Sequence, residues 1–379
     1  MYPLLRKLLS FNWVIVVLMT ALTVFGIVVI YSCTHKNPNP VYAEMWNRQA
    51  MWAIVGGLGF LAASLIDYRW IKLGALPMYL VSLVFLILTL AIGVKLEGAR
   101  SWLRLGGIQF QPAQLAVLSG ILVLALFLSH FRKLPPLHKI IGCGITAGAP
   151  ALLILKQPDF GETMIWGPVV FSMLFAARIP YRYLIALVLL LAAAAPPVYY
   201  MGLKPYQQAR ITSFLDPEID PQGASWAVNQ VMIAIGSGGW AGKGFLAENT
   251  QVELGYVPST TVPNDYIYAA IGEQWGFRGG VLLIGTFAAL ILTCLYVAYR
   301  SADDLGMLTA VGITALIFTH TFQNIGMNVS ILPVTGVPLP LISYSGTFLA
   351  VIMFGLGIVN SIWIHRKALP GAQKSSWPA

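Results

Sequence analysis

The feature that most limits what this chain can fold into is a series of long apolar runs, each about as long as a helix that crosses a bilayer core of about 30 Å. Of the 379 residues, 58% are hydrophobic and 10% are charged, whereas soluble domains carry about 25% charged residues. The alternating pattern of membrane β-strands is absent, so we expect these runs to be helices. We predict an all-α polytopic membrane protein with ten transmembrane helices, at residues 11–31, 50–66, 74–94, 112–129, 139–155, 162–177, 183–201, 279–298, 306–322 and 345–364.

The positively charged residues predict the orientation of these helices, because Lys and Arg are enriched on the cytoplasmic side of a membrane. With a cytoplasmic N-terminus, 13 of the 23 Lys and Arg residues but only three of the 14 Asp and Glu residues lie inside. Both termini are then cytoplasmic. Residues 1–379 are expected to form one membrane domain, with a large extracytoplasmic loop at 202–264 and a short cytoplasmic tail at 366–379. The net charge of +9 follows from this topology, so we expect no nucleic-acid partner.

The long outer loop carries signals of folded structure. Residues 224–236 have the apolar spacing of an amphipathic helix, and the glycines of "GSGGWAGKG" then end it. Pro196 and Pro197 are expected to end or break the membrane helix that precedes the loop. The three cysteines and five histidines are scattered, so the sequence predicts neither a disulfide framework nor a metal cluster.

Four polar or proline-rich stretches interrupt the apolar pattern, and the predicted topology places all of them on the outer face. They are residues 97–115, 156–162, 202–265 and 328–347. Irregular backbone near a membrane is tolerated where protein buries it or where it lines a water-filled cavity. We therefore expect one outward-facing polar cavity, built by these four segments.

Asp265 stands where the outer loop runs into an apolar helical stretch. It is either a helix N-cap, a role that Asn264 fills equally well, or a general base whose pKa is raised by partial burial. The residues alone weigh these two roles about equally, although an ionisable residue near a membrane span is a functional candidate.

The cations of the outer face are candidate ligands for an anionic substrate group. Arg100, Arg210 and Lys243 are suited to holding a diphosphate, because Arg offers a fork of donors and Lys a compact charge. Each of them alone is equally well explained as a solvated loop charge or as the partner of a nearby acid. As a set that faces one cavity, they favour an anionic ligand.

Three uncharged or acidic residues of the same face are further candidate substrate ligands. Gln111 and Gln114 are spaced to share one helix face, where they are able to bind a sugar or a neighbouring backbone group. Asp159 lies between two predicted spans, and we expect it mainly to cap the helix that follows.

The same stretches carry a family resemblance. The ordered motifs "GARSW", "FQPAQL", "QPDFG", "YQQARITSFLDPEIDPQGASW", "NDYIYAAIGEQWG" and "ILPVTGVPLPLISYSG" together resemble the SEDS family (shape, elongation, division and sporulation), and within it the RodA-like peptidoglycan glycosyltransferases. The likeness covers nearly the whole chain. It implies a ten-span enzyme of the bacterial cytoplasmic (inner) membrane that polymerises lipid II on the extracytoplasmic face during cell elongation.

The resemblance also implies specific roles and partners. The essential aspartate of the family corresponds to Asp265, which favours the general base over the helix cap, with polyprenyl diphosphate as the leaving group. A class B penicillin-binding protein is the implied partner and supplies transpeptidation. A divalent cation, Mg or Mn, is a candidate cofactor, and its ligands are unknown.

Two departures from the family pattern keep other functions open. An acid and a Lys that the family carries on span 4 are Gln114 and Val117 here, and the segment before Asp265 reads "PSTTVPN" in place of a stretch with an acid and a histidine. The environment of the site is therefore altered. The alternatives are a flippase for a lipid-linked precursor, disfavoured by the few polar residues in the inner halves of the spans, and a noncatalytic scaffold for the penicillin-binding protein.

Overall fold

The protein is described by a computed structural model, which covers residues 7–96, 99–105, 108–216 and 225–366. Helices make up most of the described chain, as predicted. They are α2 (Trp13–Thr34), α3 (Pro40–Ala43), α4 (Met45–Leu65), α5 (Ile71–Ile92), α6 (Pro112–His130), α7 (Pro136–Lys156), α8 (Phe160–Ala176), α9 (Tyr181–Pro197), α10 (Pro205–Leu215), α11 (Trp226–Ser237), α12 (Ile267–Tyr299), α13 (Asp304–Asn328) and α14 (Gly346–Ile364).

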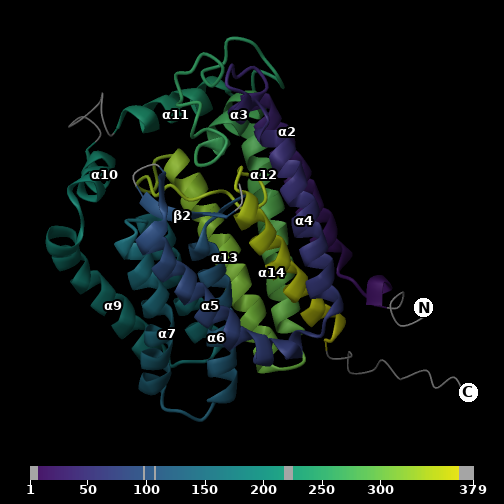
Figure 1. Cartoon of the computed structure of the whole chain (residues 1–379), viewed down its shortest axis with the longest axis vertical. Helices are drawn as coiled ribbons and strands as arrows, with labels where there is room; N and C mark the ends of the chain where they lie inside the picture. Colours follow the sequence, from purple (N-terminus) through teal and green to yellow (C-terminus); the bar gives the residue numbers. More distant parts are fainter. Residues whose placement is uncertain (1–6, 97–98, 106–107, 217–224, 367–379) are drawn as a thin grey trace, which may run out of the picture.

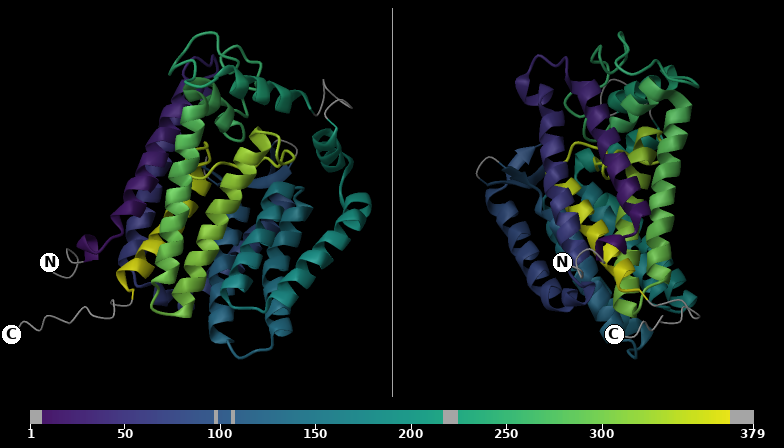
Figure 2. Two further views of the ribbon diagram at one scale, coloured as in Figure 1. Left: turned by 180° about the vertical axis from the view of Figure 1, so that it is seen from behind. Right: turned by 90° about the vertical axis from the view of Figure 1, so that its right-hand side faces the viewer.

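The long helices form one bundle around α13, which packs against α6, α8, α12 and α14 (Figure 1). Eight described helices are long and apolar enough to cross a membrane, and the shorter α8 is apolar as well. Together with α4, they lie at the ten predicted spans, and the all-helical membrane class is confirmed. α2 begins and α14 ends at the same end of the bundle (Figure 2). The count of ten crossings and the side on which each end lies stay predictions.

α9 stands apart from the rest of the bundle. Only 6% of its apolar window is buried, against 72% for α6, α13 and α14, and Figure 2 shows it leaning away from its neighbours. It ends at Pro197 and passes into a π-helical turn at Val198–Gly202, so the predicted break at the proline pair is confirmed. The chain then enters α10, which carries Arg210. The amphipathic helix predicted at 224–236 is α11.

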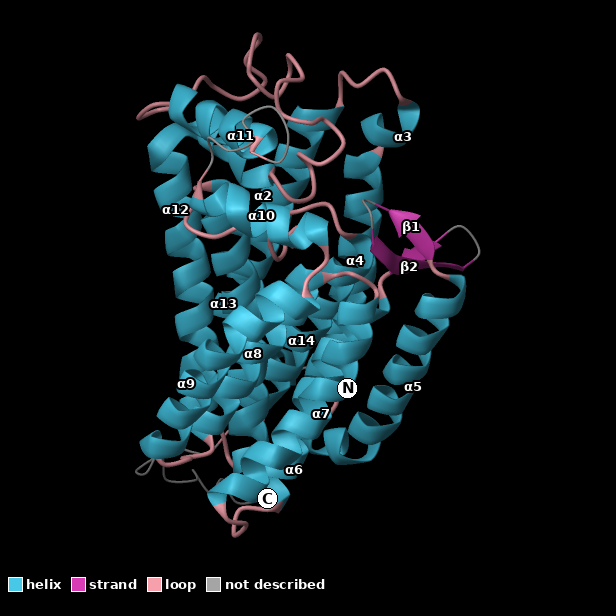
Figure 3. Ribbon diagram, turned by 90° about the vertical axis from the view of Figure 1, so that its left-hand side faces the viewer, coloured by secondary structure: helices cyan, strands magenta, loops and turns pink. Residues whose placement is uncertain are grey.

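A small antiparallel sheet joins α5 to α6 and was not predicted (Figure 3). Its strands are β1 (Val94–Leu96), β2 (Ala99–Leu105) and β3 (Ile108–Phe110), in that order. Along β2, Ser101 and Leu103 are buried while Arg100 and Arg104 are exposed, which is the alternation expected of a strand with one covered face.

α12 begins at Ile267, well before the predicted span 279–298, and it contains a kink at Gly276. Gly276 has φ 63° and ψ −161°, a conformation that glycine adopts at little cost. The N–H groups of Phe277 and Arg278 donate to carbonyl oxygens of the glycine-rich loop 238–244, at 2.9 and 3.2 Å. N–H groups of the same loop donate back to the two carbonyls freed before the kink, both at 3.0 Å. The outer loop thus completes the hydrogen bonding that the kink interrupts.

Candidate functional site

Asp265 is held in place through its main chain by two amides of α13. The side-chain nitrogens of Asn324 and Asn328 both donate to its carbonyl oxygen at 2.9 Å, and both asparagines are fully buried. α12 begins at Ile267 with Tyr266 as its N-cap, so Asp265 lies one residue outside the capping position. The choice between helix cap and general base for Asp265 stays a prediction, and the residue is partly buried.

The loop 334–337 lies against this carboxylate. Gly336 has φ 69°, and a Cβ atom built on it would lie 3.4 Å from Asp265 Oδ2. Asn324 also donates to the carbonyl of Val337, at 2.8 Å, so the amide that holds Asp265 holds this loop too. Arg210 Nη1 donates to the carbonyl of Val334 at 3.5 Å. The loop 334–337 therefore contacts both Asp265 and Arg210.

Gln111, Gln114 and Asp159 form a hydrogen-bonded chain that extends to α14. Thr347 Oγ1 donates to Gln114 Oε1 at 3.1 Å, Gln114 Nε2 donates to Gln111 Oε1 at 2.8 Å, and Gln111 Nε2 donates to Asp159 Oδ2 at 3.0 Å. Gln111, Gln114 and Thr347 are all buried. In this structure the two glutamines bind protein side chains rather than the backbone groups considered for them, and a role in sugar binding stays a prediction.

Asp159 caps α8, as predicted. Its Oδ1 accepts a hydrogen bond from the N–H of Glu162 at 3.1 Å. Burial raises the pKa of the Asp159 carboxyl to about 6, while the positive charge of Arg210 acts to lower it. Arg210 also binds the loop 334–337, so it connects Asp159 with the loop that contacts Asp265. Glu162 is 2% exposed, and neither of its carboxylate oxygens has a hydrogen-bond partner among the described residues.

Lys243 is engaged by an acid that the sequence analysis did not single out. Its ammonium lies 2.6 Å from Oε1 of Glu273, which is fully buried on α12. Glu273 also accepts hydrogen bonds from the N–H groups of Gln251 and Val252 and from the hydroxyl of Ser237. This ion pair fastens the outer loop onto the first part of α12, which starts two residues after Asp265.

Arg100 lies away from these contacts. It is exposed on β2, and no hydrogen bond or ion pair joins it to Asp265 or Asp159 within the described ranges. In the same described part of the chain, no three His, Cys, Asp or Glu side chains are close enough to hold a metal ion.

The four polar segments do come together at one end of the bundle, because the contacts of Asp265, Arg210, Asp159 and Gln111 connect all of them. The polar cavity stays a prediction. Two cavities of the described structure have volumes of about 250 and 210 Å³, and neither is lined by Asp265, Arg210, Asp159 or Gln111.

Sequence reasoning missed the two asparagines and Glu273. A signal was present for the asparagines, because they lie four residues apart just after the predicted span 306–322 and so can share one helix face. Polar residues inside a span usually have a partner within the bundle.

Comparisons with known proteins agree with this architecture. The family model for cell cycle proteins of the FtsW, RodA and SpoVE type matches residues 12–368. The peptidoglycan glycosyltransferase MrdB of Escherichia coli is 35% identical over 353 residues, which cover 93% of each chain. A chain from a structure on the coordination of polymerization and crosslinking by a peptidoglycan synthase complex superposes with a TM-score of 0.78 and 28% identity, covering 93% of this chain and 97% of that one. The rod shape determining protein RodA of Thermus thermophilus superposes with a TM-score of 0.70 and 26% identity, covering 94% of this chain and 98% of its own.

Proposed function

The chain belongs to the FtsW/RodA/SpoVE family of cell cycle proteins, and we propose that it polymerises lipid II into glycan strands with Asp265 as its general base. It is a multi-pass membrane protein, and it is a peptidoglycan glycosyltransferase like the relatives that carry that name. The observation that carries the role of Asp265 is its position. Two buried amides fix its main chain while its carboxylate lies against Gly336, at the meeting point of the polar segments.

In the proposed reaction, the Asp265 carboxylate takes the proton from the acceptor hydroxyl, the 4-OH of the GlcNAc of lipid II. The acceptor oxygen then forms a bond to the anomeric carbon of the donor glycan. The bond between that carbon and the diphosphate oxygen breaks, and polyprenyl diphosphate leaves with the electron pair. A partly buried carboxylate is suited to this role because reduced solvation makes it a stronger base.

Arg210 is the cation best suited to stabilise the departing diphosphate. It binds the loop 334–337 that also contacts Asp265, and an Arg fork matches the geometry of phosphate oxygens. Lys243 is already neutralised by Glu273, and Arg100 is exposed on β2, so we give these two a smaller part. Gln111, Gln114 and Asp159 act in this proposal by shaping the wall of the site.

The relatives support a proposed cellular setting. We place the protein in the bacterial inner membrane with the Asp265 end on the extracytoplasmic face, where it acts in cell elongation. A class B penicillin-binding protein supplies crosslinking, as expected for a chain similar to a member of a synthase complex for polymerization and crosslinking. Grooves between the spans hold the polyprenyl tails.

The test is a gel assay of lipid II polymerisation with the purified chain and its class B partner. Wild type is expected to give glycan ladders and Asp265→Asn none. The variant should fold normally, because Asn324 and Asn328 bind the carbonyl of residue 265 and not its side chain. Glu248→Gln, which changes an exposed acid of the same outer loop, is the matched control and should keep activity.

The outcomes separate the base from its alternatives. Full-length ladders from Asp265→Asn would refute the assignment of the base. If the wild type binds lipid II and its partner but forms no ladder, the scaffold role is favoured, and the neutral pair Gln114 and Val117 becomes the first place to look for the lost activity.

A further inference from the structure

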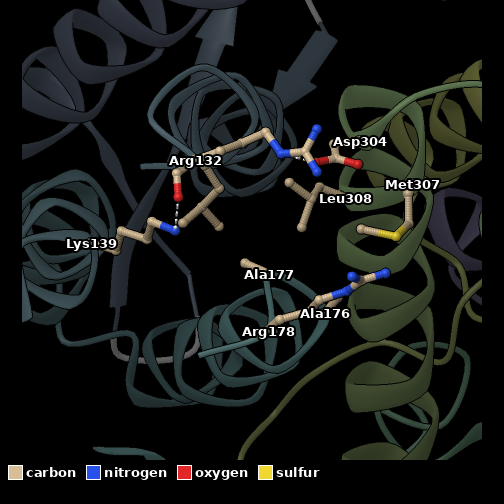
Figure 4. Close-up of a pocket in the computed structure, with 9 residues that line it drawn as sticks. Arg132, Lys139, Ala176, Ala177, Arg178, Asp304, Met307 and Leu308 are labelled. Atoms are coloured by element: carbon tan, nitrogen blue, oxygen red, sulfur yellow. Dashed lines mark hydrogen bonds and ion pairs between the residues drawn. The ribbon is translucent and has the colours of Figure 1, made fainter. Parts of the chain in front are cut away.

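A polar cavity lies at the end of the bundle opposite Asp265, and Figure 4 shows the side chains that line it. It has a volume of about 250 Å³ and lies where α6 and α8 end and α7 and α13 begin. Leu308, which lines it, is 16 residues before Asn324 on α13, so about 24 Å of helix separates the cavity from the Asp265 site. The proposed transferase reaction makes no use of this region.

The charges that line the cavity are mostly positive. Arg132, Lys139 and Arg178 contribute three cations, and Asp304 contributes the one acid. Arg132 Nε lies 2.8 Å from Asp304 Oδ2, so these two charges balance each other. Lys139 and Arg178 remain, and no carboxylate in the described part of the chain forms an ion pair with either.

Lys139 is the more unusual of the two. It is only 9% exposed, and its ammonium donates one hydrogen bond, to the carbonyl of Arg132 at 2.7 Å. An ammonium has three hydrogens to donate, so this bond leaves donors for a ligand. A buried cation is costly unless an anion accompanies it. An anionic ligand in the cavity would supply that counter-charge.

Arg178 occupies a backbone position that usually belongs to glycine. Its φ is 58°, and its N–H donates to the carbonyl of Phe175 while the N–H of Ile179 donates to that of Leu174. These two bonds define a Schellman motif at the end of α8, where the left-handed residue is commonly Gly. Strain of this kind is retained where the side chain has a use, and here the side chain lines the cavity (Figure 4).

The surroundings of the cavity suit a lipid more than a soluble molecule. Phe131 and Phe175 adjoin lining residues in the sequence and are 44% and 55% exposed. The ring of Phe175 lies 6.2 Å from that of Tyr181, which is 70% exposed. Tyr side chains near the ends of membrane helices sit at the level of the lipid headgroups, and exposed Phe rings suit the acyl chains beneath them.

We propose that this cavity binds the phosphate group of an anionic phospholipid headgroup, between Lys139 and Arg178. The phosphate oxygens accept hydrogen bonds from the Lys139 ammonium, Arg178 adds its positive charge from the other side of the cavity, and Arg132 stays with Asp304. A soluble phosphate compound shares this chemistry, so the test must separate the two sources.

The test measures lipid binding to the purified full chain by native mass spectrometry and by thermal shift. The probes are phosphatidylglycerol, phosphatidylcholine and inorganic phosphate. The variants are Lys139→Gln and Arg178→Gly, with Lys133→Gln as a matched control, since Lys133 is an exposed cation next to the cavity that does not line it. We expect wild type to retain phosphatidylglycerol in preference to phosphatidylcholine, and each variant to bind it about fivefold more weakly.

Arg178→Gly keeps the proposal falsifiable, because glycine suits the left-handed position and the variant should unfold at or above the wild-type temperature in the absence of lipid. A smaller phosphatidylglycerol shift in this folded variant, with the full shift retained in Lys133→Gln, supports the proposal. Stabilisation by inorganic phosphate and not by phosphatidylglycerol would overturn the lipid assignment. Unchanged phosphatidylglycerol binding in both cavity variants, or an equal loss in the control, would overturn the site.

Discussion

Glu273 offers a direct test of how the outer loop is fastened above the candidate site. The substitution Glu273→Gln keeps the shape of the side chain and removes its charge. Lys243 and the N–H groups of Gln251 and Val252 then lose charge-assisted hydrogen bonds, which are worth about 1.5–3 kcal/mol each. The amide oxygen retains part of these interactions, and Lys243, which is 28% exposed, regains water. We expect a net cost of about 3 kcal/mol, at the lower end of the range for breaking a buried pair.

Hydrogen–deuterium exchange of the segment 237–255 measures this cost locally. If the loop opens with a free energy lowered by about 3 kcal/mol, its protected amides should exchange about 100-fold faster than in the wild type. Amides in the middle of α13 should be unaffected, since they do not depend on the loop.

The control is Glu253→Gln on the same loop. Glu253 also lies 2.6 Å from a lysine, Lys36, but both partners of that pair are solvent-accessible, with side-chain exposures of 29% and 52%. Exposed pairs of this kind contribute little, so exchange in Glu253→Gln should match the wild type. If Glu273→Gln exchanges like the wild type, or if both variants exchange equally fast, the buried pair of Lys243 and Glu273 does not hold the loop more strongly than the exposed pair does.

Three further predictions concern other parts of the same region. Burial raises the pKa of Asp159 from 3.8 to about 6, so the folded state binds this proton more tightly than the unfolded chain. This carboxyl therefore stabilises the fold below about pH 4 and loses that contribution as the pH rises through about 6. Thermal unfolding across this range should show a smaller loss in Asp159→Asn than in the wild type, and an equal loss would refute the assignment to Asp159. Gly276→Ala should lower the unfolding temperature, because it forces a side chain at φ 63° against the outer loop. Gly285→Ala, on the same helix with open space around it, should not. Similar unfolding temperatures for the two variants would contradict the account of the kink. Gln114→Ala leaves its two buried hydrogen-bond partners with one bond fewer each and should cost about 1–3 kcal/mol in denaturant unfolding, so an unchanged midpoint would show that the chain of hydrogen bonds contributes nothing to stability.

The sequence predicted the membrane helices well because hydropathy alone decides which segments can sit in lipid. It predicted their ends less well. The predicted span began at 279, but α12 begins at Ile267 and continues through the kink at Gly276. The hydrogen bonds that the loop 238–244 supplies at this kink are not visible in any local sequence pattern. The sheet β1–β3 was missed because its strands are short and include charged residues on the exposed face.

The candidate site was predicted in part. The gathering of four polar segments at one end follows from the parity of the spans, and Asp159 caps its helix as expected. The partners of these residues were not predictable, because they are distant in sequence: Gln111 meets Asp159 across 48 residues, and Lys243 meets Glu273 across 30. Only the packing of the helices brings such pairs together.

The way in which α13 holds residue 265 also makes this position suitable for a chemical probe. Because the two asparagine amides bind the carbonyl oxygen, they would hold whichever side chain stands there in the same place. Asp265→Cys would therefore present a thiol where the carboxylate now lies. Two of the three native cysteines, Cys143 and Cys294, are buried, and replacing the partly exposed Cys33 would leave one reactive position. A fluorophore or spin label attached at that position would report the arrival and departure of ligands without relying on turnover.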